Sequence, residues 1–77
     1  LVPNPAMDFA YLKLGSMRHG ESLEISIVDI LGRVVEQQIR ETDGVIMLDI
    51  KSYSPGTYLV RARNGHKVFR GRLTKSR

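Results

Sequence analysis

Apolar and polar side chains alternate along five short stretches of the chain. In the clearest of them, Leu23, Ile25 and Ile27 point to one side while Glu24 and Ser26 point to the other. A spacing of two is typical of a β-strand with one buried face and one wet face. The other predicted inward rows are Ala10, Leu12 and Leu14; Ile46, Leu48 and Ile50; Tyr58, Val60 and Ala62; and Phe69 with Leu73.

Residues with turn-forming backbone preferences separate these stretches. Asp43-Gly44 and Asn64-Gly65 favour type I′ hairpins, in which both central residues have positive φ. Pro55-Gly56 suits a type II turn, and Asp29-x-x-Gly32 suits a longer hairpin with Asp29 capping the turn and Gly32 in the left-handed position. These breakers leave segments of strand length.

The stretch from Val34 to Glu41 fits two structures. Val34, Val35 and Ile39 could form the apolar stripe of a helix, and the residues between them favour helix. The segment is short, however, and it follows a hairpin glycine and contains two valines. We therefore predict a strand.

Six or seven antiparallel strands cannot bury their apolar faces in one flat sheet, so they must form a sandwich or a small barrel. The strand number and turn spacing favour an all-β fold, an immunoglobulin-like antiparallel β-sandwich of about seven short strands. The chain has no cysteine or tryptophan, so this prediction concerns the architecture only. At 77 residues, we expect one domain over residues 1–77, and a start at Leu1 suggests a piece of a longer protein.

Charge is divided sharply along the chain. Residues 1–50 contain eight acidic and four basic residues, whereas residues 51–77 contain eight basic residues and no acidic residue. Two interpretations are open: the basic strands could lie beside acidic strands and be compensated across the sheet, or they could form a surface for an anionic partner. No apolar run approaches the roughly 18 residues of a membrane span, so none is predicted.

Residue patterns for catalysis or for cofactor and metal binding are not found in the sequence. His19 and His66 lie beside glycines without a second ligand at metal spacing, and Asp29 and Asp43 are explained as turn residues. No serine has a nucleophile-elbow context, and no phosphate-binding glycine loop is present. We therefore expect no catalytic, cofactor-binding or metal-binding residue, and no enzyme activity.

Two surface features could contact a partner. Phe9 and Tyr11 lie on the predicted outer face of the first strand, where a loop or a neighbouring domain could equally cover them. The basic end of the chain, residues 67–77, could join another sheet or bind phosphates. Nucleic acid is not the expected partner, because the basic outer face has no aromatic side chains among its arginines, which are Arg61, Arg63, Arg70 and Arg72.

Four sequence blocks, in order, resemble the type A C-terminal sorting domain of the type IX secretion system. The first is Pro3-Asn4-Pro5 followed by Asp8 and an alternating strand. The second is an apolar strand leading into Asp29, Gly32 and Arg33, and the third is an apolar strand followed by Pro55, Gly56 and Tyr58. The fourth is a basic strand comparable to residues 67–75.

This resemblance implies an immunoglobulin-like domain that directs a larger protein of a Gram-negative bacterium through the periplasm and across the outer membrane. The implied partners are the translocation and sortase machinery and anionic lipopolysaccharide, and the domain would then be cleaved or retained at the surface. A β-sandwich adhesion or carbohydrate-binding module is the alternative. The candidate recognition residues are Pro3, Asn4, Pro5, Asp29, Gly32, Arg33, Pro55, Gly56, Tyr58, Lys67, Arg70, Arg72 and Lys75.

Overall fold

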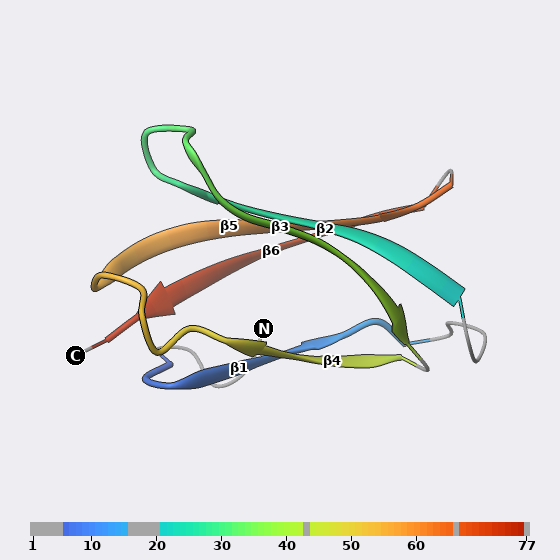
Figure 1. The fold of residues 1–77 in the computed structure, drawn as a ribbon, viewed down its shortest axis with the longest axis horizontal. Coiled ribbons are helices and arrows are strands. Elements are labelled where there is room, and N and C mark those ends of the chain that lie inside the picture. Colours follow the sequence, from blue (N-terminus) through green and yellow to red (C-terminus); the bar gives the residue numbers. More distant parts are fainter. Residues whose placement is uncertain (1–5, 16–20, 43, 66, 77) are drawn as a thin grey trace.

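The computed structural model describes residues 6–15, 21–42, 44–65 and 67–76, which form six β-strands (Figure 1). The prediction of an all-β chain is confirmed, including the strand over the ambiguous stretch that begins at Val34. The strands are β1 Phe9–Lys13, β2 Glu21–Asp29, β3 Val34–Thr42, β4 Val45–Asp49, β5 Gly56–Asn64 and β6 Lys67–Lys75.

The strands form two antiparallel sheets that stack face to face (Figure 1). The small sheet pairs β1 with β4, and the large sheet has the order β3-β2-β5-β6. This arrangement confirms the predicted sandwich and is consistent with an immunoglobulin-like architecture.

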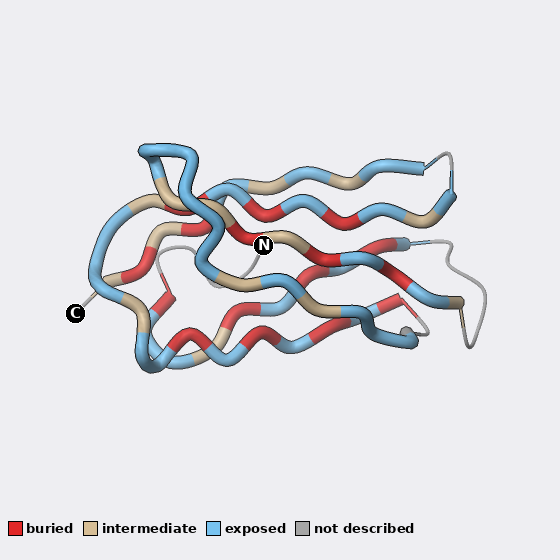
Figure 2. Tube along the Cα trace, turned by 45° about the horizontal axis from the view of Figure 1, so that its top comes forward, coloured by how far each residue is buried: buried red, intermediate tan, exposed pale blue. Residues whose placement is uncertain are grey.

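The core lies between the inward rows of the two sheets. Figure 2 shows the buried positions alternating with exposed ones along the strands, as a period of two requires. Leu23, Ile25 and Ile27 of the large sheet and Ile46 and Leu48 of the small sheet are at most 2% exposed. Each such side chain contributes roughly 1.5–3 kcal/mol on burial, a large share of the roughly 5–15 kcal/mol that stabilises a domain.

The connection from β3 to β4 differs from the prediction. Asp43 lies outside the described residues, but β3 and β4 on either side of it belong to different sheets and do not pair as the strands of a hairpin would. A hairpin would add β4 beside β3 and leave the apolar face of the large sheet uncovered. Crossing to the other sheet instead places Ile46 and Leu48 against that face, and Gly44 accepts the hydrogen bond of Leu14 N–H at 2.7 Å.

Two further turn predictions were wrong in detail. Asn64 pairs with Lys67 and has no positive φ, so Asn64 closes the β5–β6 ladder and is not a central residue of the turn. Gly56 has a φ of 149°, far from the roughly 80° of a type II corner, because it already begins β5 opposite Lys75. The turn before β5 closes earlier, where Tyr53 N–H donates to the carbonyl of Ile50 at 3.0 Å.

Candidate functional site

The β2–β3 hairpin is fixed by Asp29, as the sequence predicts. One carboxylate oxygen accepts the backbone N–H groups of Leu31 at 2.9 Å and Arg33 at 3.0 Å, and the other accepts Nε of Arg33 at 2.9 Å. Gly32 has a φ of 84° and donates its N–H to the carbonyl of Asp29 at 3.0 Å, which confirms the left-handed position. Arg33 thus presents its guanidinium from a preorganised turn.

The same contacts shift the protonation of Asp29. Desolvation alone would raise the pKa of Asp29, but the hydrogen bonds from the N–H and guanidinium of Arg33 and from Leu31 N–H together outweigh it. The pKa of Asp29 therefore lies below its ordinary value, and the carboxylate keeps its charge at neutral pH.

The segment before β5 is fixed by two tyrosines. The hydroxyl of Tyr58 donates to the carbonyl of Ser54 at 2.5 Å, four residues upstream. This is the geometry of the tyrosine corner of immunoglobulin-like sandwiches. The ring of Tyr53 packs at 5.1 Å from the ring of Tyr58, centroid to centroid. Together the two rings hold the segment that contains Pro55 and Gly56.

Tyr53 also connects this segment to β3. Its hydroxyl donates to Glu36 at 2.7 Å. On the same, inner side of β3, the amide of Gln38 donates to Glu36, and the guanidinium of Arg40 donates to Gln38. Burial, and then the hydrogen bond to Glu36, raise the pKa of Tyr53 far above its ordinary value. Tyr53 consequently remains a hydrogen-bond donor at neutral and mildly alkaline pH.

The end of β6 joins the beginning of the described chain. Ala6 N–H donates to the carbonyl of Thr74 at 2.8 Å, and Ser76 N–H donates to the carbonyl of Ala6 at 2.7 Å, in a parallel bridge between Ala6 and Lys75. Lys75 is 8% exposed and its ammonium donates to the carbonyl of Met7. The side chain of Lys75 is therefore turned inward in the folded domain.

Segments from three of the sequence blocks meet at one end of the sandwich. Asp29 pairs directly with Tyr58 in the β2–β5 ladder, and Gly56 pairs with Lys75 in the β5–β6 ladder. A cavity of about 640 Å³ lies between the β2–β3 hairpin and the segment before β5. We call this region, residues 29–33 with 52–58, the motif end; its cavity is lined by Asp29, Ile30, Leu31, Arg33, Val35, Glu36, Ser52, Tyr53, Ser54, Pro55, Gly56, Thr57 and Tyr58.

The remaining predicted recognition residues lie elsewhere. Pro3, Asn4 and Pro5 are outside the described residues, although Ala6, which follows them, reaches β6 next to the motif end. Lys67 begins β6 at the opposite end of the strand, while Arg70 and Arg72 are exposed on the outer face of the large sheet.

Sequence reasoning missed several residues of the motif end. Tyr53 and Glu36 were not singled out, because neither belongs to a turn motif and their contact spans 17 positions. Ile30 and Leu31 are 76% and 74% exposed at the hairpin tip. Two adjacent aliphatic residues inside an Asp-x-x-Gly turn were the available signal.

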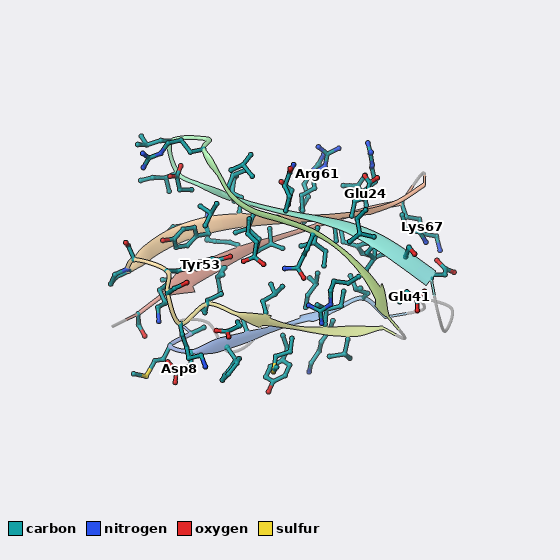
Figure 3. All side chains as sticks on the ribbon, viewed as in Figure 1. Asp8, Glu24, Glu41, Tyr53, Arg61 and Lys67 are labelled. Carbon is teal, nitrogen blue, oxygen red and sulfur yellow. The ribbon has the colours of Figure 1, made fainter. Side chains whose placement is uncertain are left out.

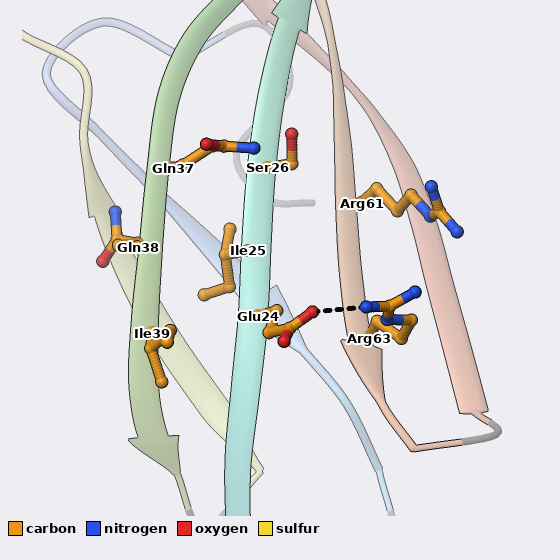
Figure 4. Close-up of a pocket in the computed structure, with 8 residues that line it drawn as sticks. All are labelled: Glu24, Ile25, Ser26, Gln37, Gln38, Ile39, Arg61 and Arg63. Carbon is orange, nitrogen blue, oxygen red and sulfur yellow. Dashed lines mark hydrogen bonds and ion pairs between the residues drawn. The ribbon is translucent and has the colours of Figure 1, made fainter.

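The structure shows partial charge compensation across the large sheet. Glu24 on β2 binds Arg63 on β5 at 2.7 Å, and both project from the outer face, as Figures 3 and 4 show for Glu24. Arg61 lies on the same face, opposite Ser26 rather than an acid. Among the described ion pairs, one acidic side chain pairs across strands with an arginine of this face, and it does not neutralise the positive charge of the face.

The other surface feature lies on the small sheet. The ammonium of Lys51 sits 5.1 Å from the ring centre of Phe9, while Tyr11 is exposed opposite Met47. His19 and His66 are outside the described residues. Among the residues that are described, no three His, Cys, Asp or Glu side chains gather as metal ligands, and no helix is long and apolar enough to cross a membrane.

The fold and the motif end together define an all-β sandwich domain in which turn motifs from separate parts of the sequence meet at one pole. A family model for the secretion system C-terminal sorting domain matches residues 1–75, nearly the whole chain. The chain belongs to this family, the C-terminal sorting domains of type IX secretion. A comparison with curated proteins found no match.

Proposed function

We propose that this chain is a non-catalytic sorting signal whose motif end and adjacent edge strand β6 are bound by the type IX translocation and sortase machinery. The observation that carries the proposal is the meeting of three sequence blocks at one pole, through the Asp29–Tyr58 and Gly56–Lys75 pairs. A receptor that binds this end of the sandwich would contact several of the sequence motifs at once.

The chemistry of the motif end suits protein recognition. Its hairpin presents two exposed aliphatic side chains, Ile30 and Leu31, beside the guanidinium of Arg33, whose side chain is 75% exposed. Apolar anchors next to arginine are enriched where protein interfaces concentrate their binding energy. The turn is already fixed by Asp29, so little conformational entropy is lost on binding.

Strand β6 offers a second mode of contact. It is an outer strand of the large sheet, and the described contacts on its outer edge are those of Ala6 around Lys75, so β-augmentation by a strand of another protein is proposed for residues 67–73. In this proposal the domain passes through the periplasm, is recognised at the outer membrane, and is then removed or retained at the surface. Anionic lipopolysaccharide is the proposed partner of the cationic surface.

A reporter fusion tests whether the motif end is the recognised surface. A periplasmically exported reporter carrying the 77-residue chain at its C-terminus is expressed in a bacterium with a functional type IX system, and its surface fraction is measured. We expect Leu31→Ser with Arg33→Gln to lower the surface fraction several-fold, because both side chains are exposed and the hairpin contacts of Asp29 to the backbone remain. Unchanged delivery of a folded double variant would refute recognition at this pole.

The matched control changes the opposite side of the sandwich. Tyr11→Ser with Lys13→Gln removes one exposed apolar and one basic residue of the small sheet. Delivery should stay as in the unaltered fusion. Loss of delivery with this control, but not with the motif-end variant, would instead assign the contact to the small sheet.

A further inference from the structure

Four hydrogen-bond donors form one transverse row on the outer face of the large sheet. Ser26 of β2 lies opposite Gln37 of β3 on one side and Arg61 of β5 on the other, and Arg61 lies opposite Arg70 of β6. At a strand spacing of about 4.8 Å, the row extends roughly 14 Å across the sheet. Every strand of the large sheet contributes one donor.

The pairing of Arg61 with Arg70 is unfavourable for folding. Thr74 directs its carbonyl to Ala6, away from β5, so alternate residues of β6, including Arg70, direct their backbone groups the same way. Arg61 and Arg70 are therefore a non-hydrogen-bonded pair, the kind in which opposite side chains are closest, with Cα atoms about 4.5 Å apart. Like charges directly opposite each other destabilise a sheet.

No acidic side chain among the described residues forms an ion pair with Arg61 or Arg70, whereas neighbouring Arg63 is bound to Glu24. Figure 4 shows Glu24 turned toward Arg63, with Arg61 extending from the face beside them. A ligand that supplies negative charge at Arg61 and Arg70 would remove the repulsion that the fold itself leaves in place.

We propose that this row binds the anionic groups of a sulfated, phosphorylated or carboxylated polysaccharide. Arginine forks bind such groups through paired charge-assisted hydrogen bonds, and Ser26 and Gln37 supply neutral donors for hydroxyl and further anionic oxygens. A depression of about 640 Å³ borders the row, lined by Ser26, Gln37, Arg61 and their neighbours. A shallow row across four strands fits an extended chain better than a single small ion.

The composition of the face distinguishes this ligand from two others. The outer-face positions of β5 are Thr57, Leu59, Arg61 and Arg63, and no described outer-face position of the large sheet carries an aromatic ring for stacking on nucleic acid bases. The exposed aliphatic residues Leu59 and Val68 lie in different rows, separated by the row of Arg61 and Arg70. Leu59 does continue a short apolar row with Val28 of β2 and Val34 of β3, but this row ends at Arg72 of β6. The apolar area is therefore one row wide and bordered by arginines, unlike the broad apolar face that inserts into a bilayer.

This site deepens the proposed function, because it names the residues through which the cationic surface would bind an anionic polysaccharide. It rests on the proposed function only for where in the cell such binding would occur. Binding is measured on the 77-residue chain by isothermal titration with dextran sulfate, with uncharged dextran as the ligand control, from 50 to 300 mM salt. If the chain bound uncharged dextran with the same affinity as dextran sulfate, the proposal would be overturned.

Paired variants locate the site. Arg61→Gln with Arg70→Gln should weaken binding roughly tenfold or more and reduce the log–log salt slope by one to two, because two charge-assisted contacts are lost. Lys13→Gln with Lys51→Gln removes the same charge from the other side of the sandwich and should change the affinity less than about twofold. Equal losses in the two pairs would show general attraction only and would overturn the proposal.

Two further measurements separate the alternatives. The urea midpoint of Arg61→Gln with Arg70→Gln should equal or exceed that of the unaltered chain, and a lower midpoint would contradict the repulsion on which the site depends. Vesicles of phosphatidylglycerol that bind tightly, with no binding of dextran sulfate, would assign the face to a lipid surface instead. The sorting function is measured separately, by the surface delivery of the reporter fusion. The polysaccharide site and the sorting function can therefore fail independently of each other.

Discussion

Asp29 and Tyr58 lie directly opposite each other in the β2–β5 ladder, and each fixes a different turn. Asp29 holds the β2–β3 hairpin through its carboxylate, while Tyr58 holds the segment before β5 through its hydroxyl. The register of the β2–β5 ladder thereby brings two motifs that are 29 positions apart in sequence to the same end of the sandwich. A change at either residue should loosen its own turn and leave the core rows intact.

The charge of Asp29 should stabilise the fold at neutral pH and lose this effect in acid. Its folded pKa is lowered, so the stabilisation is present above the unfolded pKa of about 3.9 and disappears as pH falls through the folded value. Asp29→Asn should therefore lower the urea midpoint at pH 7, with a much smaller difference from the unaltered chain at pH 2. An equal difference at both pH values would show that the carboxylate charge is not involved.

Tyr58→Phe should destabilise the domain by about 1 kcal/mol, because it removes the hydroxyl that donates to Ser54 and keeps the buried ring. The change is measured as a shift of the urea midpoint at constant slope. Tyr11→Phe is the control on the exposed face and should stay within about 0.5 kcal/mol. Matching effects of the two substitutions would contradict the tyrosine-corner role.

Tyr53 should make the fold sensitive to alkaline pH. Its folded pKa is raised, so its contribution is complete below the unfolded pKa of about 10 and declines as pH rises above that value, where only the unfolded chain releases the proton. Tyr53→Phe should reduce the loss of stability between pH 9 and pH 11. An ultraviolet titration of the unaltered chain should show a tyrosine ionisation above the ordinary tyrosine pKa that is lost in Tyr53→Phe; titration curves that do not differ at this end would be inconsistent with the contact to Glu36.

Lys75→Met should loosen the junction between the two ends of the described chain. Methionine fills most of the buried space but cannot donate to the carbonyl of Met7. The amide protons of Ala6 and Ser76, which form the bridge, should exchange with solvent at least several-fold faster, while the amide of Val60 in the core of the large sheet keeps its rate. Unchanged exchange at Ala6 and Ser76 would show that the ammonium contact does not hold the junction.

Local rules predicted much of this fold because they depend on neighbouring residues only. The alternation of Leu23, Ile25 and Ile27 identified an inward row, and Asp29 with Gly32 identified a hairpin by side-chain capping and positive φ. Both follow from the geometry of a few consecutive residues.

Long-range pairing explains what the sequence did not predict. Asp43-Gly44 has the local chemistry of a hairpin, yet the need to cover the apolar face of the large sheet sends β4 to the other layer. The inward position of Lys75 depends on Met7, which is 68 positions away, and the repulsion between Arg61 and Arg70 depends on the β5–β6 register. The number of strands was likewise predicted only as a range, six or seven, because it depends on which segments pair with one another in the folded chain.

We expect this chain to be both sufficient and necessary to direct a protein through type IX secretion. The most direct measurement is the surface fraction of the reporter fused to the 77-residue chain, compared between cells with and without a working type IX translocon and with a fusion lacking residues 66–77. We expect surface delivery only for the complete chain in cells with the translocon, and periplasmic accumulation in the other cases. Surface delivery without the translocon, or without residues 66–77, would contradict this account.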